Sequence, residues 1–130
     1  MLDKIEYWLD LADEDVSVAN LLLSGMKCLQ AGFFCHLVAE KALKATIASI
    51  SSTVPPKTHD LIRLAELGGV IDDLSEAQSD LLEELNPLNI EARYPDHKAS
   101  IASVLTPEKT ANLLSETRDL LCWIKRKLGK

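Results

Sequence analysis

Residues 28–51 restrict the fold more than any other part of the chain, because they are apolar on nearly every face of a helix. A helix of this kind is either central in its domain or covered by a partner chain. Its polar residues form one narrow stripe, with His36, Glu40 and Lys44 one helical turn apart and Lys41 beside them. The sequence thus predicts a buried central helix with a single polar edge.

Two other long helices are predicted, one before and one after this segment. Residues 2–25 repeat apolar side chains at steps of three and four, and a Ser-Gly pair ends them. Thr106 suits the N-cap and Pro107 the first turn of a closing helix, which Gly129 ends. The apolar faces consist of Ile5, Trp8, Leu9, Ala12, Val16, Ala19, Leu22 and Leu23 in the first segment and of Leu113, Leu114, Thr117, Leu120, Leu121, Ile124 and Leu128 in the last.

A third, shorter helix is predicted after a proline-containing loop. Residues 51–57 are interpreted as this loop, since two adjacent prolines prevent the preceding helix from continuing. Thr58 is then predicted to be the N-cap of the third helix, with Asp60 in its first turn. The helix is expected to run to Leu67, where a Gly-Gly pair follows.

A capping box marks the start of a fourth helix, and a proline marks its predicted end. Ser75 and Gln78 have the spacing of the box, and the helix is expected to end near Pro87. Residues 88–105 are expected to be irregular. Together these patterns predict one all-α domain over residues 1–130, an antiparallel up-and-down helical bundle of four to five helices. The aromatic content of 5% also disfavours a β-sandwich.

Charge and cysteine content exclude several classes of function. The net charge is −6, and an acidic domain is a poor generic binder of duplex DNA, which requires a basic surface. Cys28, Cys35 and Cys122 are odd in number and form no C-x-x-C pair, so neither a disulfide framework nor a cysteine-based zinc site is expected. No histidine has metal-ligand spacing, and we expect no metal and no cofactor.

The distribution of charge along the chain bears on location and partners. Charges interrupt the first residues, and the uncharged runs are too short to cross a membrane, so we expect a cytoplasmic protein without a signal peptide. Acidic residues dominate residues 1–15 and basic residues dominate the C-terminus, which suits the dipoles of a first and a last helix. A second interpretation is that Lys125, Arg126, Lys127 and Lys130 extend a path for RNA.

Three polar clusters are candidates for a functional site, and the first is the stripe on the central helix. The spacing lets Glu40 reach both His36 and Lys44, with Lys41 alongside. This cluster is either a structural ion network on the solvated edge of an apolar helix or a polar groove with a lysine positioned for phosphate.

The second cluster is Thr58-His59-Asp60, at the predicted start of the third helix. One interpretation is a capped helix start with polar residues in its first turn. The other is an anion site, in which free backbone N–H groups at the helix N-terminus act together with His59.

The third cluster contains Arg93, Tyr94, Asp96 and His97 around a proline. In one interpretation Arg93 clamps a phosphate while His97 moves a proton and Tyr94 assists, which is the chemistry of metal-free RNA cleavage. In the other, Arg93 pairs with Asp96 in a surface loop and Tyr94 packs beneath it.

These three clusters, in this order on a helical plan, resemble the HEPN domain family. The matching stretches are Gly32–Ala45, with its A-E-K-A-L-K-A core, Lys57–Leu61, and Ala92–Asp96, with A-R-Y-P-D, and the resemblance covers residues 3–128. It implies an antiparallel helical bundle that is often a homodimer. It also implies a small prokaryotic protein that is frequently paired with a minimal nucleotidyltransferase on a separate chain.

In such pairs the HEPN protein is often an RNase toxin and the nucleotidyltransferase its antitoxin, while other members bind nucleotides. The resemblance therefore implies a nucleotide- or RNA-binding protein of a toxin–antitoxin-like pair; the alternatives are an active metal-independent endoribonuclease and a purely structural helical adaptor. Catalytic members separate Arg and His by a longer stretch than the three residues between Arg93 and His97. The residues that map onto nucleotide or RNA binding are His36, Glu40, Lys41, Lys44, His59, Asp60 and Arg93, and those that map onto catalysis are Arg93, Tyr94 and His97.

A homodimer is also expected from the apolar surplus of residues 28–51. Phe33, Phe34, Leu37 and Ile47 have no obvious neighbour within a bundle of four or five helices. Exposed apolar patches of this size usually mark interfaces, and a two-fold dimer is the commonest solution.

Overall fold

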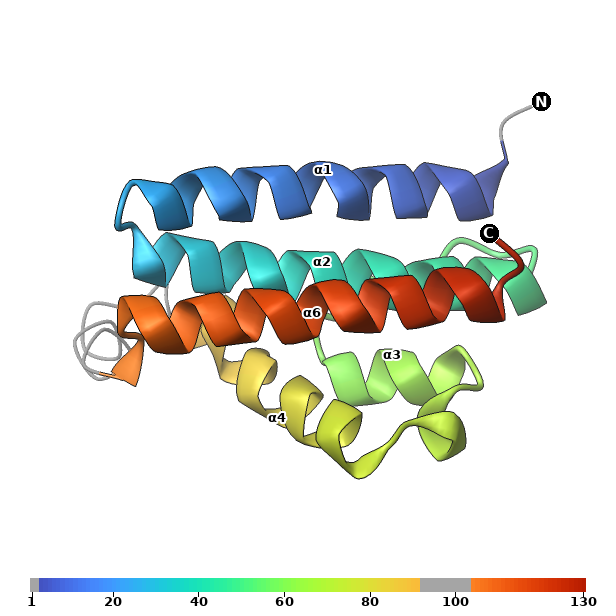
Figure 1. The fold of residues 1–130 in the computed structure, drawn as a ribbon. Coiled ribbons are helices and arrows are strands. Elements are labelled where there is room, and N and C mark those ends of the chain that lie inside the picture. Colours follow the sequence, from blue (N-terminus) through green and yellow to red (C-terminus); the bar gives the residue numbers. More distant parts are fainter. Residues whose placement is uncertain (1–2, 92–103) are drawn as a thin grey trace.

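The central position predicted for the second helix is the organising feature of the fold. The computed structural model describes residues 3–91 and 104–130, with only the backbone placed at 90 and 91, and within these residues all regular secondary structure is helical. The elements are α1 (Lys4–Ser24), α2 (Cys28–Ile50), α3 (Leu61–Leu67), the short 3₁₀ turn η1 (Ile71–Asp73), α4 (Glu76–Glu91) and α6 (Pro107–Lys127). Helix α2 packs against α1, α3, α4 and α6 (Figure 1).

Small side chains let the neighbours of α2 approach it closely. Ala39, Ala42 and Ala45 are fully buried along the helix, and α1 forms the most extensive contact with it. Close packing of this kind excludes water from the interface between the two helices, which lies along an α2 about 35 Å long. The expectation of a buried central helix is therefore confirmed.

The four long helices alternate in direction along the chain, as an up-and-down bundle requires. Helix α1 and helix α4 run one way in Figure 1, and α2 and α6 run the other way. Helix α3 and the turn η1 are placed in the connection between α2 and α4, where α3 contacts both of these helices. In the described residues, no helix is long and apolar enough to cross a membrane.

Helix α3 starts later than the sequence suggests, and a different residue caps it. Asp60 is the N-cap, and its Oδ1 accepts hydrogen bonds from the backbone N–H groups of Ile62 and Arg63. The prediction of Thr58 as the cap is wrong. The Thr58 hydroxyl instead accepts a hydrogen bond from the backbone N–H of Asp60, so it orders the residue that does the capping.

Helix α4 continues beyond the proline at which it was predicted to end. It starts at the expected capping box, in which Ser75 and Gln78 exchange hydrogen bonds, but it runs through Pro87 to Glu91. Pro87 has no N–H to donate to the carbonyl one turn earlier, which costs free energy. Burial of Leu88 in the next turn favours the helical continuation.

Candidate functional site

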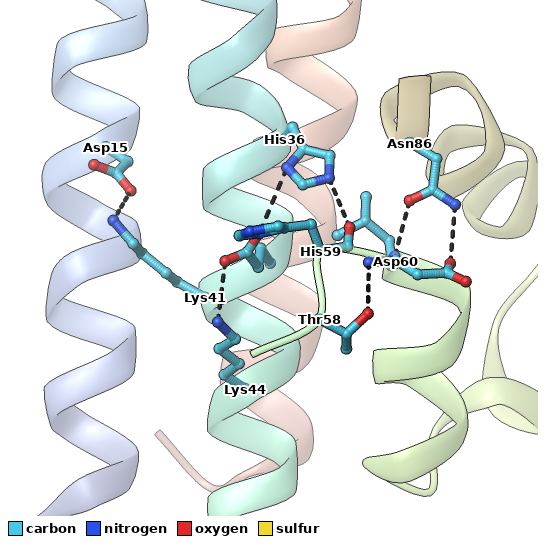
Figure 2. A network of polar contacts seen from close by, with 10 residues as sticks. Asp15, His36, Lys41, Lys44, Thr58, His59, Asp60 and Asn86 are labelled. Carbon is cyan, nitrogen blue, oxygen red and sulfur yellow. Dashed lines mark hydrogen bonds and ion pairs between the residues drawn. The ribbon is translucent and has the colours of Figure 1, made fainter. Parts of the chain in front are cut away.

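Glu40 is the hub of a polar cluster between α2 and the residues that precede α3. It is 5% exposed, and each of its two carboxylate oxygens has a partner. The Nδ1 atom of His59 donates a hydrogen bond to Oε1 over 2.9 Å, and the Nζ atom of Lys44 donates to Oε2 over 3.0 Å. The carboxylate therefore bridges His59 and Lys44, which Figure 2 labels.

His36 attaches the same cluster to the backbone that leads into α3. It is fully buried, and its Nε2 atom donates a hydrogen bond to the carbonyl oxygen of His59 over 3.0 Å. Its Nδ1 atom lies 3.7 Å from Oε1 of Glu40 and has no hydrogen-bond partner. His36 thus fixes the main chain at His59.

Burial and charge set the protonation of the cluster. Burial alone raises the pKa of Glu40, but hydrogen bonds from His59 and Lys44 and the charge of Lys44 outweigh it and hold the pKa below its usual value. Burial lowers the pKa of His36, and the attraction of Glu40 offsets this only in part. At neutral pH the cluster therefore contains an ionised Glu40 beside a neutral His36.

The residues at the start of α3 do not form the anion site that was one interpretation of Thr58-His59-Asp60. Asp60 already accepts from the N–H groups of Ile62 and Arg63. The side-chain oxygen of Asn86, on α4, accepts from the N–H of Leu61 over 2.8 Å. Backbone donors that are bonded within the protein are not free for a ligand, so that interpretation is wrong.

Asn86 is a site residue that the sequence analysis missed. Besides accepting from Leu61, it donates through Nδ2 to Oδ1 of Asp60 over 3.1 Å, which ties α4 to the start of α3 (Figure 2). An amide one residue before a proline gave no signal of this role, because the contact joins positions that are distant in the chain. Asn86 and Pro87 line an open pocket of about 440 Å³ together with Thr58, His59 and Asp60.

Lys41 belongs to a different contact from its neighbours in the sequence. Its ammonium group pairs with Asp15 of α1, on the other side of α2 from His59 (Figure 2). Lys44 also lies over the ring of Trp8, with its Nζ atom 5.4 Å from the ring centroid. The buried Asp15 occupies a position in the apolar stripe of α1, and this is the sequence signal that could have identified it.

The structure thus brings together His36, Glu40, Lys44, His59 and Asp60 and separates Lys41 from them. The proposed catalytic residues Arg93, Tyr94 and His97 lie outside the described residues. In the described part of the chain, no group of three metal-ligating side chains is present. Burial raises the pKa of the Cys35 thiol to about 12, which keeps it protonated and unreactive.

The C-terminal lysines are engaged in ion pairs within the protein. Lys125 contacts Asp13 over 2.7 Å, Lys127 contacts Asp73 over 2.8 Å, and Lys130 contacts Asp3 and Glu6. The ends of α1 and α6 that carry most of these charges lie at the same end of the bundle (Figure 1). Tertiary pairing therefore explains much of the uneven charge distribution, and a path for RNA along these lysines gains no support.

The fold and the polar cluster define a small helical-bundle domain with a candidate site on its second helix. The chain matches the HEPN domain family over residues 5–127, and it belongs to this family. The matched range spans all three clusters that carried the resemblance in the sequence. No curated protein and no solved structure matches the chain.

Proposed function

We propose that this HEPN domain binds a nucleotide or RNA through the cluster around Glu40 and the pocket beside His59. The observation that carries the proposal is the polar cluster itself. A helix that is otherwise packed in the core keeps a carboxylate, a histidine and a lysine at a place where His59 and the pocket face solvent. Buried charged groups are costly, and their concentration beside a pocket is typical of a binding site.

The partner in this proposal is a minimal nucleotidyltransferase on a separate chain, in a cytoplasmic toxin–antitoxin-like pair. Family membership supports it, because the resemblance that implied this pairing extends over nearly the whole chain. Co-expression of the protein with a minimal nucleotidyltransferase from the same genome tests the pairing. A complex that survives purification supports the pair, and separate elution of the two proteins counts against it.

A homodimer is part of the proposal, with Phe33 and Leu37 on its interface. Both side chains are half-buried, and they lie one turn apart on α2. Ile47, which was expected to contribute, is buried in the core at 5% exposure and needs no partner. Light scattering tests this point: a dimer gives twice the chain mass of 14.3 kDa, and the mass of one chain would refute it.

Binding itself is tested with fluorescently labelled RNA and with ATP in the presence of EDTA. We expect saturable binding by the wild type and a loss of about tenfold or more in affinity for Glu40→Ala, because this change dismantles the cluster. Absence of binding to every probe would refute the proposal and favour the structural adaptor. Cleavage of the RNA that is lost in Arg93→Ala and His97→Ala would favour the metal-independent endoribonuclease.

A further inference from the structure

We infer that His59 recognises a ribose hydroxyl, so that the site accepts ribonucleotides and discriminates against their deoxy counterparts. The inference rests on the proposed function, and it concerns which chemical group of the ligand the site reads. It follows from the direction of the hydrogen bonds around His59, from the acceptors left free beside it, and from its exposure.

Glu40 determines which nitrogen of His59 carries the proton. An ionised carboxylate can only accept a hydrogen bond, so Nδ1 of His59, at 2.9 Å from Oε1, must be the donor. In a neutral imidazole the other nitrogen, Nε2, then presents a lone pair. The hydrogen bond from His36 to the carbonyl oxygen of His59 fixes the main chain, and Lys44 holds the second oxygen of Glu40. The acceptor at Nε2 is therefore oriented before any ligand arrives.

Free acceptors also lie beside His59 in the pocket. Asp60 receives its three hydrogen bonds on Oδ1, and no described residue donates to its Oδ2. The backbone donors of α3 are already bonded to Asp60 and Asn86. A phosphate would meet the carboxylate of Asp60 here, and the backbone N–H groups at the start of α3 are not free to bind it.

A group that donates hydrogen bonds fits such a pocket. His59 has a side-chain exposure of 46%, and among the described residues its Nε2 atom has no partner. The ribose 2′-hydroxyl is the donor that distinguishes RNA from DNA at a protein site. The phosphates of the ligand are then held outside this pocket, and the sugar edge faces His59.

Five matched ligands test this inference by fluorescence anisotropy or competition: an RNA 12-mer, its 2′-fluoro and DNA counterparts, and the pair ATP and dATP. The 2′-fluoro strand keeps an RNA-like sugar pucker and lacks the hydroxyl donor. We expect the wild type to prefer RNA to 2′-fluoro RNA by about fivefold, the contribution of one net hydrogen bond. A preference for ATP over dATP without one for RNA would assign the site to free nucleotides and keep the role of His59.

Two variants separate recognition from structure. In His59→Asn the side-chain amide can still donate to Glu40, but the acceptor at Nε2 is gone. In Glu40→Gln the amide oxygen is drawn to Lys44, so that its NH₂ group faces Nδ1 of His59 and inverts the tautomer. We expect both variants to remain folded by thermal unfolding and to bind RNA and 2′-fluoro RNA equally. The ¹⁵N shifts of the His59 ring should report the inverted tautomer in Glu40→Gln.

The outcomes distinguish this inference from the proposed function. Equal affinity of the wild type for the hydroxyl and fluoro ligands would overturn the inference and leave nucleotide binding in place. Retention of the preference in a folded His59→Asn variant would overturn it as well. If none of the probes binds to the wild type, the proposed function fails and the inference fails with it.

Discussion

Glu40 and Lys41 are neighbours in the sequence, yet they take part in contacts on opposite sides of α2. Lys41 pairs with Asp15 and joins α2 to α1, and no further polar partner of Asp15 is present among the described residues. Glu40 joins α2 to the residues before α3 through His59, with Lys44 and His36 beside it. The first contact is a closed pair, and the second is a network with one member open to solvent.

The difference separates a contact that serves the fold from one that the proposal assigns to ligand binding. A closed ion pair between two packed helices fixes how the helices align and neutralises both charges. It requires no further polar partner. A network that continues to a half-exposed histidine at a pocket keeps a polar group available for a ligand. The same helix thus serves the core on one side and the candidate site on the other.

The largest expected loss of stability comes from removing the carboxylate of Glu40. Glu40→Ala leaves Lys44 with no carboxylate, takes the acceptor from His59 and opens a cavity in a buried position. We expect a loss of about 3 kcal/mol in the free energy of unfolding, measured by urea denaturation. A loss below about 1 kcal/mol would mean that the network contributes little to the fold.

The next effect tests the close approach of the end of α3 to α2. Gly68 caps the C-terminus of α3, and a Cβ atom there would overlap Oγ1 of Thr46. Gly68→Ala should therefore cost about 2 kcal/mol in the free energy of unfolding and shift the NMR signals of His59 more than those of Asp15. Gly25→Ala is the control, since its nearest contacts would lie at 3.7 Å. Equal effects of the two changes would contradict the packing described.

A smaller effect is expected on the α1 side. Lys41→Met keeps most of the side-chain stem and removes the charge, which leaves the buried Asp15 unpaired. We expect a loss of about 1 kcal/mol, because Lys41 is itself partly exposed and water can solvate the carboxylate in part. RNA and nucleotide affinity should not change. An affinity loss matching that of Glu40→Ala would show that the two contacts are not separate.

The pH dependence of stability gives the smallest expected effect. Folding lowers the pKa of His36 below 6.5, so the unfolded chain binds more protons as pH falls below that value, and stability declines. Folding also lowers the pKa of Glu40 below 4.5, which adds a second decline at lower pH. Urea denaturation between pH 7 and pH 4 should show the first decline and the onset of the second, and His36→Gln should lose the first. A first step that persists in His36→Gln would assign it to other groups.

Local chemistry explains which parts of the fold were predictable. The N-cap at Thr106 and the capping box of Ser75 and Gln78 are confirmed, because a cap depends on residues a few positions apart. Thr58 and Asp60 are both good caps, and their local sequence does not decide between them. The contact of Asp60 with Asn86 favours the later start, and burial of Leu88 carries α4 past Pro87.

The candidate site was predictable only in part, because local spacing does not reveal contacts between separate segments of the chain. The periodicity of α2 placed His36, Glu40 and Lys44 on one edge, and this holds because residues four apart in a helix lie on one face. The same periodicity grouped Lys41 with them, although its long side chain reaches α1. Neither the hydrogen bond between His59 and Glu40 nor the role of Asn86 could be derived, since each joins separate segments.

The sequence by itself determined the helical class, the central place of α2 and the family, because these depend on apolar spacing and on short motifs along the chain. Only the tertiary structure decided that the N–H groups of α3 are occupied and that Glu40 orients His59. Directions of hydrogen bonds and the occupancy of donors depend on how segments pack in space. A pattern of residue types along one chain does not contain that information.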